Sequence, residues 1–85
     1  MYEILISKKA ARNFNRLDWK YKEKILKVFF VLKTDPYFGK PLCGELKGLY
    51  SVRAWPYRIV YQIHKKQLII HILNVGHRKD VYEIF

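Results

Sequence analysis

The chain has 85 residues, of which 51% are hydrophobic, so residues 1–85 can form one small domain with a single core. Its formal net charge of +10 favours a nucleic acid, an acidic membrane surface or an acidic protein as binding partner. Cys43 is the single cysteine, which excludes an internal disulfide. No stretch approaches the roughly 20 apolar residues of a membrane span, so we predict a cytoplasmic protein without a membrane partner.

The first half of the chain has the pattern of one short strand followed by two helices. Residues 2–6 are mostly apolar and predict a strand, after which Ser7 offers an N-cap oxygen for a first helix. Asp18 is the expected cap of a second helix over residues 19–33. Apolar residues recur there at helical spacing, namely Tyr21, Ile25, Val28, Phe29 and Leu32.

The second half has the pattern of a loop followed by three strands. Residues 34–41 contain two prolines and a glycine, which predicts a loop. Strands are then expected over residues 49–54, 57–64 and 68–75, with Gly76 ending the last one and a short helical stub near the C-terminus. The predicted fold class is therefore α+β, in the order β-α-α-β-β-β, with an antiparallel sheet packed on two N-terminal helices.

Side chains alternate across a strand, which separates a core face from an open face. In the first of the three strands the predicted core residues are Tyr50, Val52 and Ala54. In the second they are Tyr57, Ile59, Tyr61 and Ile63, which leaves on the open face Arg58, Val60, Gln62 and His64. The third strand is apolar on both faces, so the pattern does not separate them.

Three arginines are predicted to converge on the open face. Arg53 and Arg58 lie on neighbouring strands, and a bulge at Gly76 would aim Arg78 at the same surface. Such a set could grip a phosphate group, as an RNA would require. The alternative is that each arginine pairs with an acidic residue, for which the candidates are Glu45, Asp80 and Glu83.

Three further residues each have more than one possible role. His77 could transfer a proton near neutral pH or be a plain turn residue. Tyr82 could stack on a base, take part in proton transfer, or anchor the C-terminus. Trp55 could stack on a base or pack at the sheet edge.

The motifs that the chain lacks also limit its chemistry. It has no glycine-rich phosphate loop and no Ser/His/Asp arrangement, and its seven acidic residues are scattered. Metal-dependent phosphodiester cleavage uses clustered carboxylates, so a chain of this kind that cuts nucleic acid is expected to do so without a metal or other cofactor.

Several segments together resemble the RelE/ParE superfamily of toxins from toxin–antitoxin systems. Within it they resemble the RelE-type mRNA endoribonucleases, especially the archaeal or thermophile-like members. The resemblance covers nearly the whole chain. It is carried by the element order, by residues 45–48 (Glu-Leu-Lys-Gly), by residues 57–61 (Tyr-Arg-Ile-Val-Tyr) and by the ending Gly-His-Arg-Lys-Asp-Val-Tyr at residues 76–82.

This resemblance implies a RelE-like microbial ribonuclease fold and cleavage of mRNA in the ribosomal A site, by attack of a 2′-OH on the adjacent phosphate. Translation would thereby be inhibited. The implied catalytic residues are Arg53, Arg58, Arg78, Tyr82 and His77. Those implied in RNA binding are Lys47, Ser51, Trp55 and Lys79.

The chain departs from the family pattern at one strand. Well-studied members have a lysine where this chain has Ser51, and arginine at position 53 is a poor general base because its pKa lies above about 12. The base is therefore unassigned, with His77 as the preferred candidate. Two alternatives remain: a ParE-like toxin that poisons DNA gyrase, and a non-catalytic RNA-binding remnant.

Charge and family resemblance together imply the partners. Besides the ribosome and mRNA, we expect an acidic, partly disordered antitoxin of the RelB kind, encoded next to this chain. Such an antitoxin should lay a strand or helix over the domain and cover or distort the basic face.

Overall fold

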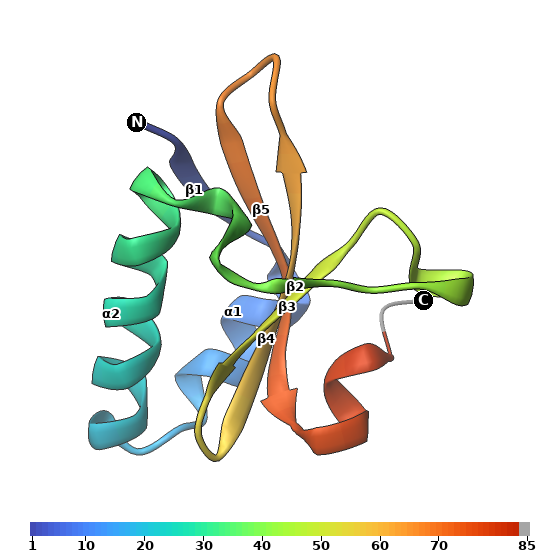
Figure 1. Cartoon of the computed structure of the whole chain (residues 1–85). Helices are drawn as coiled ribbons and strands as arrows, with labels where there is room; N and C mark the ends of the chain where they lie inside the picture. Colours follow the sequence, from blue (N-terminus) through green and yellow to red (C-terminus); the bar gives the residue numbers. More distant parts are fainter. Residues whose placement is uncertain (84–85) are drawn as a thin grey trace.

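The computed structural model describes residues 1–83, except for the side chains of Arg78 and Lys79. Two helices, α1 (Lys8–Asn15) and α2 (Trp19–Thr34), pack on one face of a five-stranded sheet (Figure 1). The strands are β1 (Glu3–Ile6), β2 (Lys40–Pro41), β3 (Tyr50–Ala54), β4 (Tyr57–His64) and β5 (Ile69–His77). Short 3₁₀ helices connect or follow them, namely η1 (Pro36–Phe38), η2 (Gly44–Leu46) and η3 (Arg78–Tyr82).

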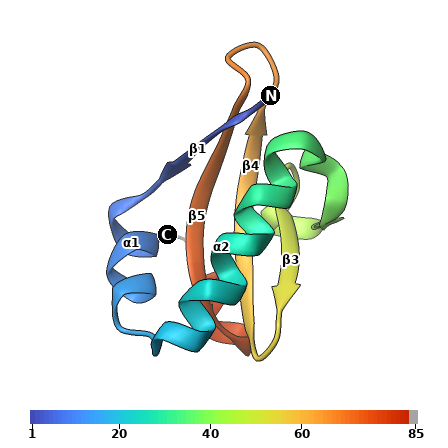
Figure 2. The same cartoon turned by 90° about the vertical axis from the view of Figure 1, so that its left-hand side faces the viewer.

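The sheet has the strand order β1-β5-β4-β3-β2 and is mixed. Strands β3, β4 and β5 form the predicted antiparallel meander, but β1 pairs with β5 in parallel. The predicted α+β fold is confirmed, and the sheet departs from the expected antiparallel pairing at this edge. Parallel neighbours need a long connection, and the two helices and strands β2, β3 and β4 lie between β1 and β5 in the chain. Figure 2 shows β1 running beside β5.

The helix boundaries follow the predicted capping residues. Ser7 accepts a hydrogen bond from the backbone N–H of Ala10 at 3.1 Å and donates one to the Leu73 carbonyl at 2.9 Å. One serine therefore both caps α1 and joins it to β5. Asp18 occupies the N-cap position of α2 but makes no side-chain capping hydrogen bond.

The predicted core faces of β3 and β4 are confirmed, because their residues pack with the helices in one cluster. The central members of this cluster are Ile25, Phe29, Leu32, Val52, Ile59 and Tyr61. In β5, where the sequence pattern was ambiguous, Ile70 and Ile72 belong to the same cluster.

The opposite face is less open than predicted. Val60, expected on the open face, is fully buried with Leu49 and Val81 in a second small cluster. The cause is η3, whose Val81 packs back onto the sheet. The strand β5 also runs to His77, so Gly76 lies within it and does not end it.

A register shift in the sheet lies elsewhere than predicted. Tyr61 pairs with Ile72 while Val60 pairs with Asn74, so Leu73 is the extra residue of β5. The expected bulge at Gly76 is not observed, and Gly76 pairs directly with Arg58. An extra residue reverses which face the following side chains occupy, so the shift changes where every side chain after Leu73 points.

The hydroxyl group of Tyr61 fixes the segment that leads into β2. It donates a hydrogen bond to the Pro36 carbonyl at 2.7 Å and accepts one from the Gly39 N–H at 3.0 Å. A Cβ atom at Gly39 would lie 2.7 Å from both this hydroxyl and the Ser51 carbonyl oxygen, so only glycine allows this close approach. Burial, as the main cause, raises the pKa of Tyr61 to about 12.

We expect Tyr61→Phe to lower the free energy of unfolding by about 1–3 kcal/mol, because the Pro36 carbonyl and the Gly39 N–H lose their partner. The wild-type protein should also lose stability as the pH rises from 10.0 towards about 12, because the folded state holds a proton on Tyr61 that the unfolded state releases. Urea unfolding at pH 8 and at pH 11 measures both effects.

The phenylalanine variant should lack this alkaline component. Tyr2→Phe is the matched control, because the Tyr2 hydroxyl has no hydrogen bond among the described residues. Equal unfolding midpoints for the wild type and Tyr61→Phe at both pH values would contradict the role assigned to this hydroxyl.

Candidate functional site

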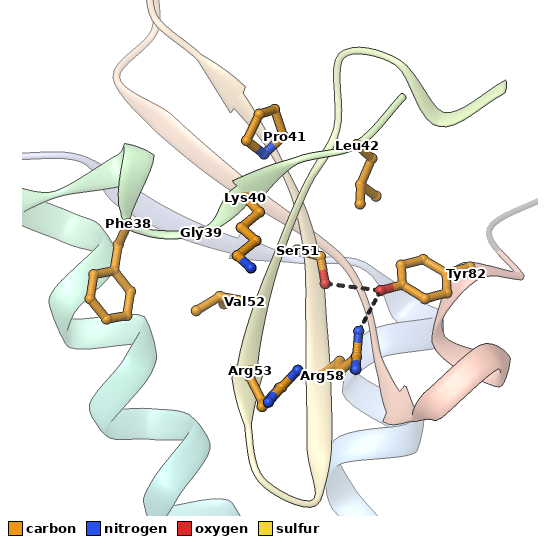
Figure 3. Close-up of a pocket in the computed structure, with 10 residues that line it drawn as sticks. All are labelled: Phe38, Gly39, Lys40, Pro41, Leu42, Ser51, Val52, Arg53, Arg58 and Tyr82. Carbon is orange, nitrogen blue, oxygen red and sulfur yellow. Dashed lines mark hydrogen bonds between the residues drawn. The ribbon is translucent and has the colours of Figure 1, made fainter. Parts of the chain in front are cut away.

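A pocket of about 490 Å³ opens on the sheet face opposite the helices, between β2, the meander and η3 (Figure 3). Its lining combines cationic, hydroxyl and apolar side chains. The lining residues are Phe38, Gly39, Lys40, Pro41, Leu42, Ser51, Val52, Arg53, Arg58 and Tyr82. Four of the predicted site residues are therefore brought together, namely Ser51, Arg53, Arg58 and Tyr82.

The phenol oxygen of Tyr82 is the centre of the polar cluster in this pocket. Arg58 donates a hydrogen bond from Nη1 to this oxygen at 3.1 Å, and the hydroxyl of Ser51 lies 3.4 Å from it (Figure 3). Each of the three side chains comes from a different element, namely β3, β4 and η3. The geometry thus connects the C-terminal turn to the two central strands.

The same cluster lowers the pKa of Tyr82. Partial burial is the largest single influence and acts in the opposite direction. It is outweighed by the hydrogen bonds with Ser51 and Arg58, together with the positive charges of Arg58 and Arg53. The phenolate form of Tyr82 is therefore more accessible than that of an ordinary tyrosine.

Arg53 and Arg58 lie directly opposite each other on β3 and β4 and therefore point to the same face. In the part of the chain that the structure describes, the one ion pair joins Lys27 and Glu23 on α2, so neither arginine is neutralised by a carboxylate. The alternative that these two arginines pair with acidic residues is wrong for the described residues. Two like charges side by side favour a bound anion.

Asn74 holds η3, and thus Tyr82, against the sheet. It is the one buried polar residue among those described, and each polar atom of its side chain has a partner. Its amide nitrogen donates to the Val81 carbonyl at 3.0 Å, while its side-chain oxygen accepts from Asn13 at 2.8 Å and from the Val75 N–H at 2.9 Å. The sequence reasoning missed this residue, because a single asparagine in an apolar strand carries no periodic signal.

Three other predicted site residues lie away from the pocket. His77 pairs with Tyr57 in the sheet, and their rings are 5.7 Å apart, on the face that also carries α2. The register shift at Leu73 is the physical reason, because without it His77 would alternate onto the pocket face. Trp55 is 68% exposed in the turn between β3 and β4, and Lys47 is exposed between η2 and β3.

The remaining two predicted residues, Arg78 and Lys79, begin η3 directly after β5. Their side chains lie outside the described residues, so their predicted roles stay predictions.

Lys40 is a pocket residue that the sequence reasoning missed. It lies in a stretch predicted to be a loop, but the structure pairs it with Ser51 across β2 and β3. A strand of two residues that contains a proline shows no alternation, so no pattern could identify it. The Gly-Lys-Pro sequence at residues 39–41 was the available signal, since glycine permits a close backbone approach.

The described residues contain no group of three or more histidine, cysteine, aspartate or glutamate side chains placed to hold a metal ion. None of the helices in the described part has the length and apolar character needed to span a bilayer. The polar side chains that line the pocket are cations and hydroxyl groups.

Two helices packed on one face of a mixed five-stranded sheet define a small α+β domain, and comparison with known proteins identifies the family. Residues 4–82 match the model of the ParE toxin of the type II toxin–antitoxin system, parDE. Toxin RelE of Mycobacterium tuberculosis is 34% identical over 98% of this chain and 88% of its own length. Toxin RelG of the same organism is 32% identical over 95% of each chain.

The fold is shared with a solved structure as well. The toxin–antitoxin complex RelBE2 from Mycobacterium tuberculosis contains a chain that matches with a TM-score of 0.84 and 32% identity, covering 91% of this chain and 98% of that one. The chain belongs to the RelE/ParE family and is a toxin of a type II toxin–antitoxin system.

We expect Arg58→Ala to raise the pKa of Tyr82, because the variant removes a hydrogen bond and a positive charge that favour the phenolate. The measurement is a pH titration of the Tyr82 ¹³Cζ resonance by NMR. Arg12→Ala, which removes an exposed arginine from α1, is the matched control and should leave the pKa unchanged. An unchanged Tyr82 pKa in Arg58→Ala would show that the contact does not persist in solution.

Proposed function

We propose that this toxin is a ribosome-dependent endoribonuclease that cleaves mRNA in the cytoplasm without a metal ion and so inhibits translation. The observation that carries the proposal is the pocket that Arg53 and Arg58, with no carboxylate partner among the described residues, line together with the phenol of Tyr82, to which Arg58 is hydrogen-bonded. Two cations and a phenol with a lowered pKa are suited to a phosphodiester that gains negative charge during reaction.

In the proposed reaction the 2′-OH of a nucleotide loses its proton as its oxygen forms a bond to the adjacent phosphorus. The bond from phosphorus to the 5′-oxygen then breaks, and that oxygen takes up a proton. The products are a 2′,3′-cyclic phosphate and a 5′-OH. Arg53 and Arg58 would stabilise the dianionic phosphorane, and Arg78 is expected either to stabilise charge or to protonate the leaving 5′-oxygen.

The proton acceptor in this scheme is Tyr82. Its phenol lies in the pocket beside Arg58 and its pKa is lowered, whereas the His77 ring contacts Tyr57 on the other face of the sheet. Geometry therefore favours Tyr82 over His77, which was preferred from the sequence. In this scheme Arg58 both binds the phosphate and makes the phenolate accessible.

A second candidate function is poisoning of DNA gyrase, which the ParE description of the matching family model keeps open. A third is RNA binding without cleavage, suggested by Ser51. The three differ in what the unmutated protein does: the ribonuclease cuts mRNA, the gyrase poison induces a DNA-damage response without mRNA cuts, and the binding remnant is not toxic.

We expect the unmutated protein to cut mRNA on programmed ribosomes, and Arg58→Ala to lower the cleavage rate about 10²–10³-fold. Primer extension on the mRNA measures the cuts. Arg12→Ala on α1 is the control and should cut at the wild-type rate. Wild-type cleavage by Arg58→Ala would contradict the proposal.

The proposed regulatory partner is an acidic antitoxin of the RelB kind, encoded beside this chain. The net charge of +10 supports an acidic partner. An apolar stripe on α2 supports an amphipathic segment: Trp19, Leu26 and Phe30 follow one another at helical spacing and are 68%, 44% and 67% exposed. The same helix carries five lysines, at positions 20, 22, 24, 27 and 33, which suit acidic residues on the partner.

We expect Phe30→Ser to weaken binding of the neighbouring gene product about tenfold or more, because it removes a large exposed anchor, while mRNA cleavage is unchanged. Titration calorimetry gives the affinity. Leu68→Asn is the control, since Leu68 is also exposed but lies in the turn between β4 and β5. An antitoxin that binds Phe30→Ser as tightly as the wild type does not use this stripe.

A further inference from the structure

The short edge strand β2 places a third cation at the pocket. Lys40 lies directly opposite Ser51, and residues that face each other in antiparallel strands point to the same side of the sheet. Ser51 contacts the Tyr82 phenol from that side. In Figure 3 the Lys40 side chain extends from β2 into the pocket that Arg53 and Arg58 also line.

The position of Lys40 is fixed by the residue before it. The Gly39 N–H donates to the buried Tyr61 hydroxyl, and Gly39 lies so close to the Ser51 carbonyl that no side chain fits there. A shift of β2 by one residue would bring a residue with a Cβ atom into this space. The Tyr61 hydroxyl and the Ser51 carbonyl, which both lie against Gly39, therefore set the register of β2 that turns Lys40 towards the pocket.

The charges around Lys40 also require an explanation. Lys40, Arg53 and Arg58 all line one pocket, and within the described residues none of them forms an ion pair. Like charges that share a concave surface repel one another, and a bound anion removes that repulsion. The pocket thus offers three cations from three different strands to one negatively charged group.

We propose that Lys40 is a catalytic residue of this pocket, which binds a non-bridging oxygen of the same phosphate that Arg53 and Arg58 hold. This inference rests on the proposed ribonuclease function. The ammonium group stabilises the charge that develops on the phosphorane, so its contribution is larger in the transition state than in the substrate complex. Its loss therefore lowers kcat more than it raises KM.

Two experiments test this assignment, and the first uses cleavage of mRNA on programmed ribosomes. Lys40→Met keeps the length of the side chain and removes the charge, and it is expected to lower the rate at saturation about 10²-fold. Lys40→Arg keeps the charge and is expected to retain most of the rate. If the aliphatic chain of Lys40 had a purely structural role, Lys40→Met would keep the wild-type cleavage rate and Lys40→Arg would be the slower variant. Lys66→Ala, in the exposed turn between β4 and β5, is the matched control.

The second experiment does not depend on cleavage. Inorganic phosphate is titrated into the protein, and the Tyr82 ¹³Cζ resonance reports binding in the pocket. Lys40→Met is expected to weaken the phosphate affinity about tenfold, whereas Lys66→Ala leaves it unchanged. An unmutated protein that binds phosphate through Lys40 but cuts no mRNA would overturn the ribonuclease proposal and keep Lys40 as an anion ligand. Wild-type rate and wild-type phosphate affinity in Lys40→Met would overturn the assignment of Lys40 alone.

Discussion

The hydroxyl group of Tyr61 is the constraint on which the pocket depends. It belongs to a residue of the main core, and it satisfies one carbonyl of the short 3₁₀ helix η1 and the N–H of Gly39, which follows that helix. Without that pair of hydrogen bonds, residues 36–39 would have to find water for these groups or lose contact with the sheet. The two residues of β2, which follow directly, take their register from this anchor.

The opposite wall of the pocket is held in a comparable way. Asn74 is buried in β5 and uses its amide to bind the backbone of η3, which carries Tyr82. Both walls thus depend on a short 3₁₀ helix that a buried side chain of the meander fixes by hydrogen bonds, while the arginines lie on the meander itself. Rigid strands position the cations, and two satisfied polar groups position the residues that face them.

The regular part of this architecture could be predicted from the sequence because it is periodic. Alternation in β3 and β4 identified the core face, and so placed Arg53 and Arg58 together on the other face. The remainder depends on contacts between distant residues. The shift at Leu73 sends His77 to the helix face, and no local pattern marks it. The pairing of Lys40 with Ser51 depends on Gly39 and Tyr61, which are 22 residues apart.

The loop between β2 and β3 has a further consequence for how such a toxin can diverge. The Leu42 N–H binds the Leu49 carbonyl at 2.8 Å, which closes the loop at its base. Gly44 and Gly48 within it adopt positive φ angles, and a Cβ atom at either would meet nothing within 4 Å. Since the register of Lys40 is set before this loop begins, exposed loop positions other than these two glycines can change without displacing the cations. The fold thereby separates a surface loop that can vary from the pocket in which the cations lie.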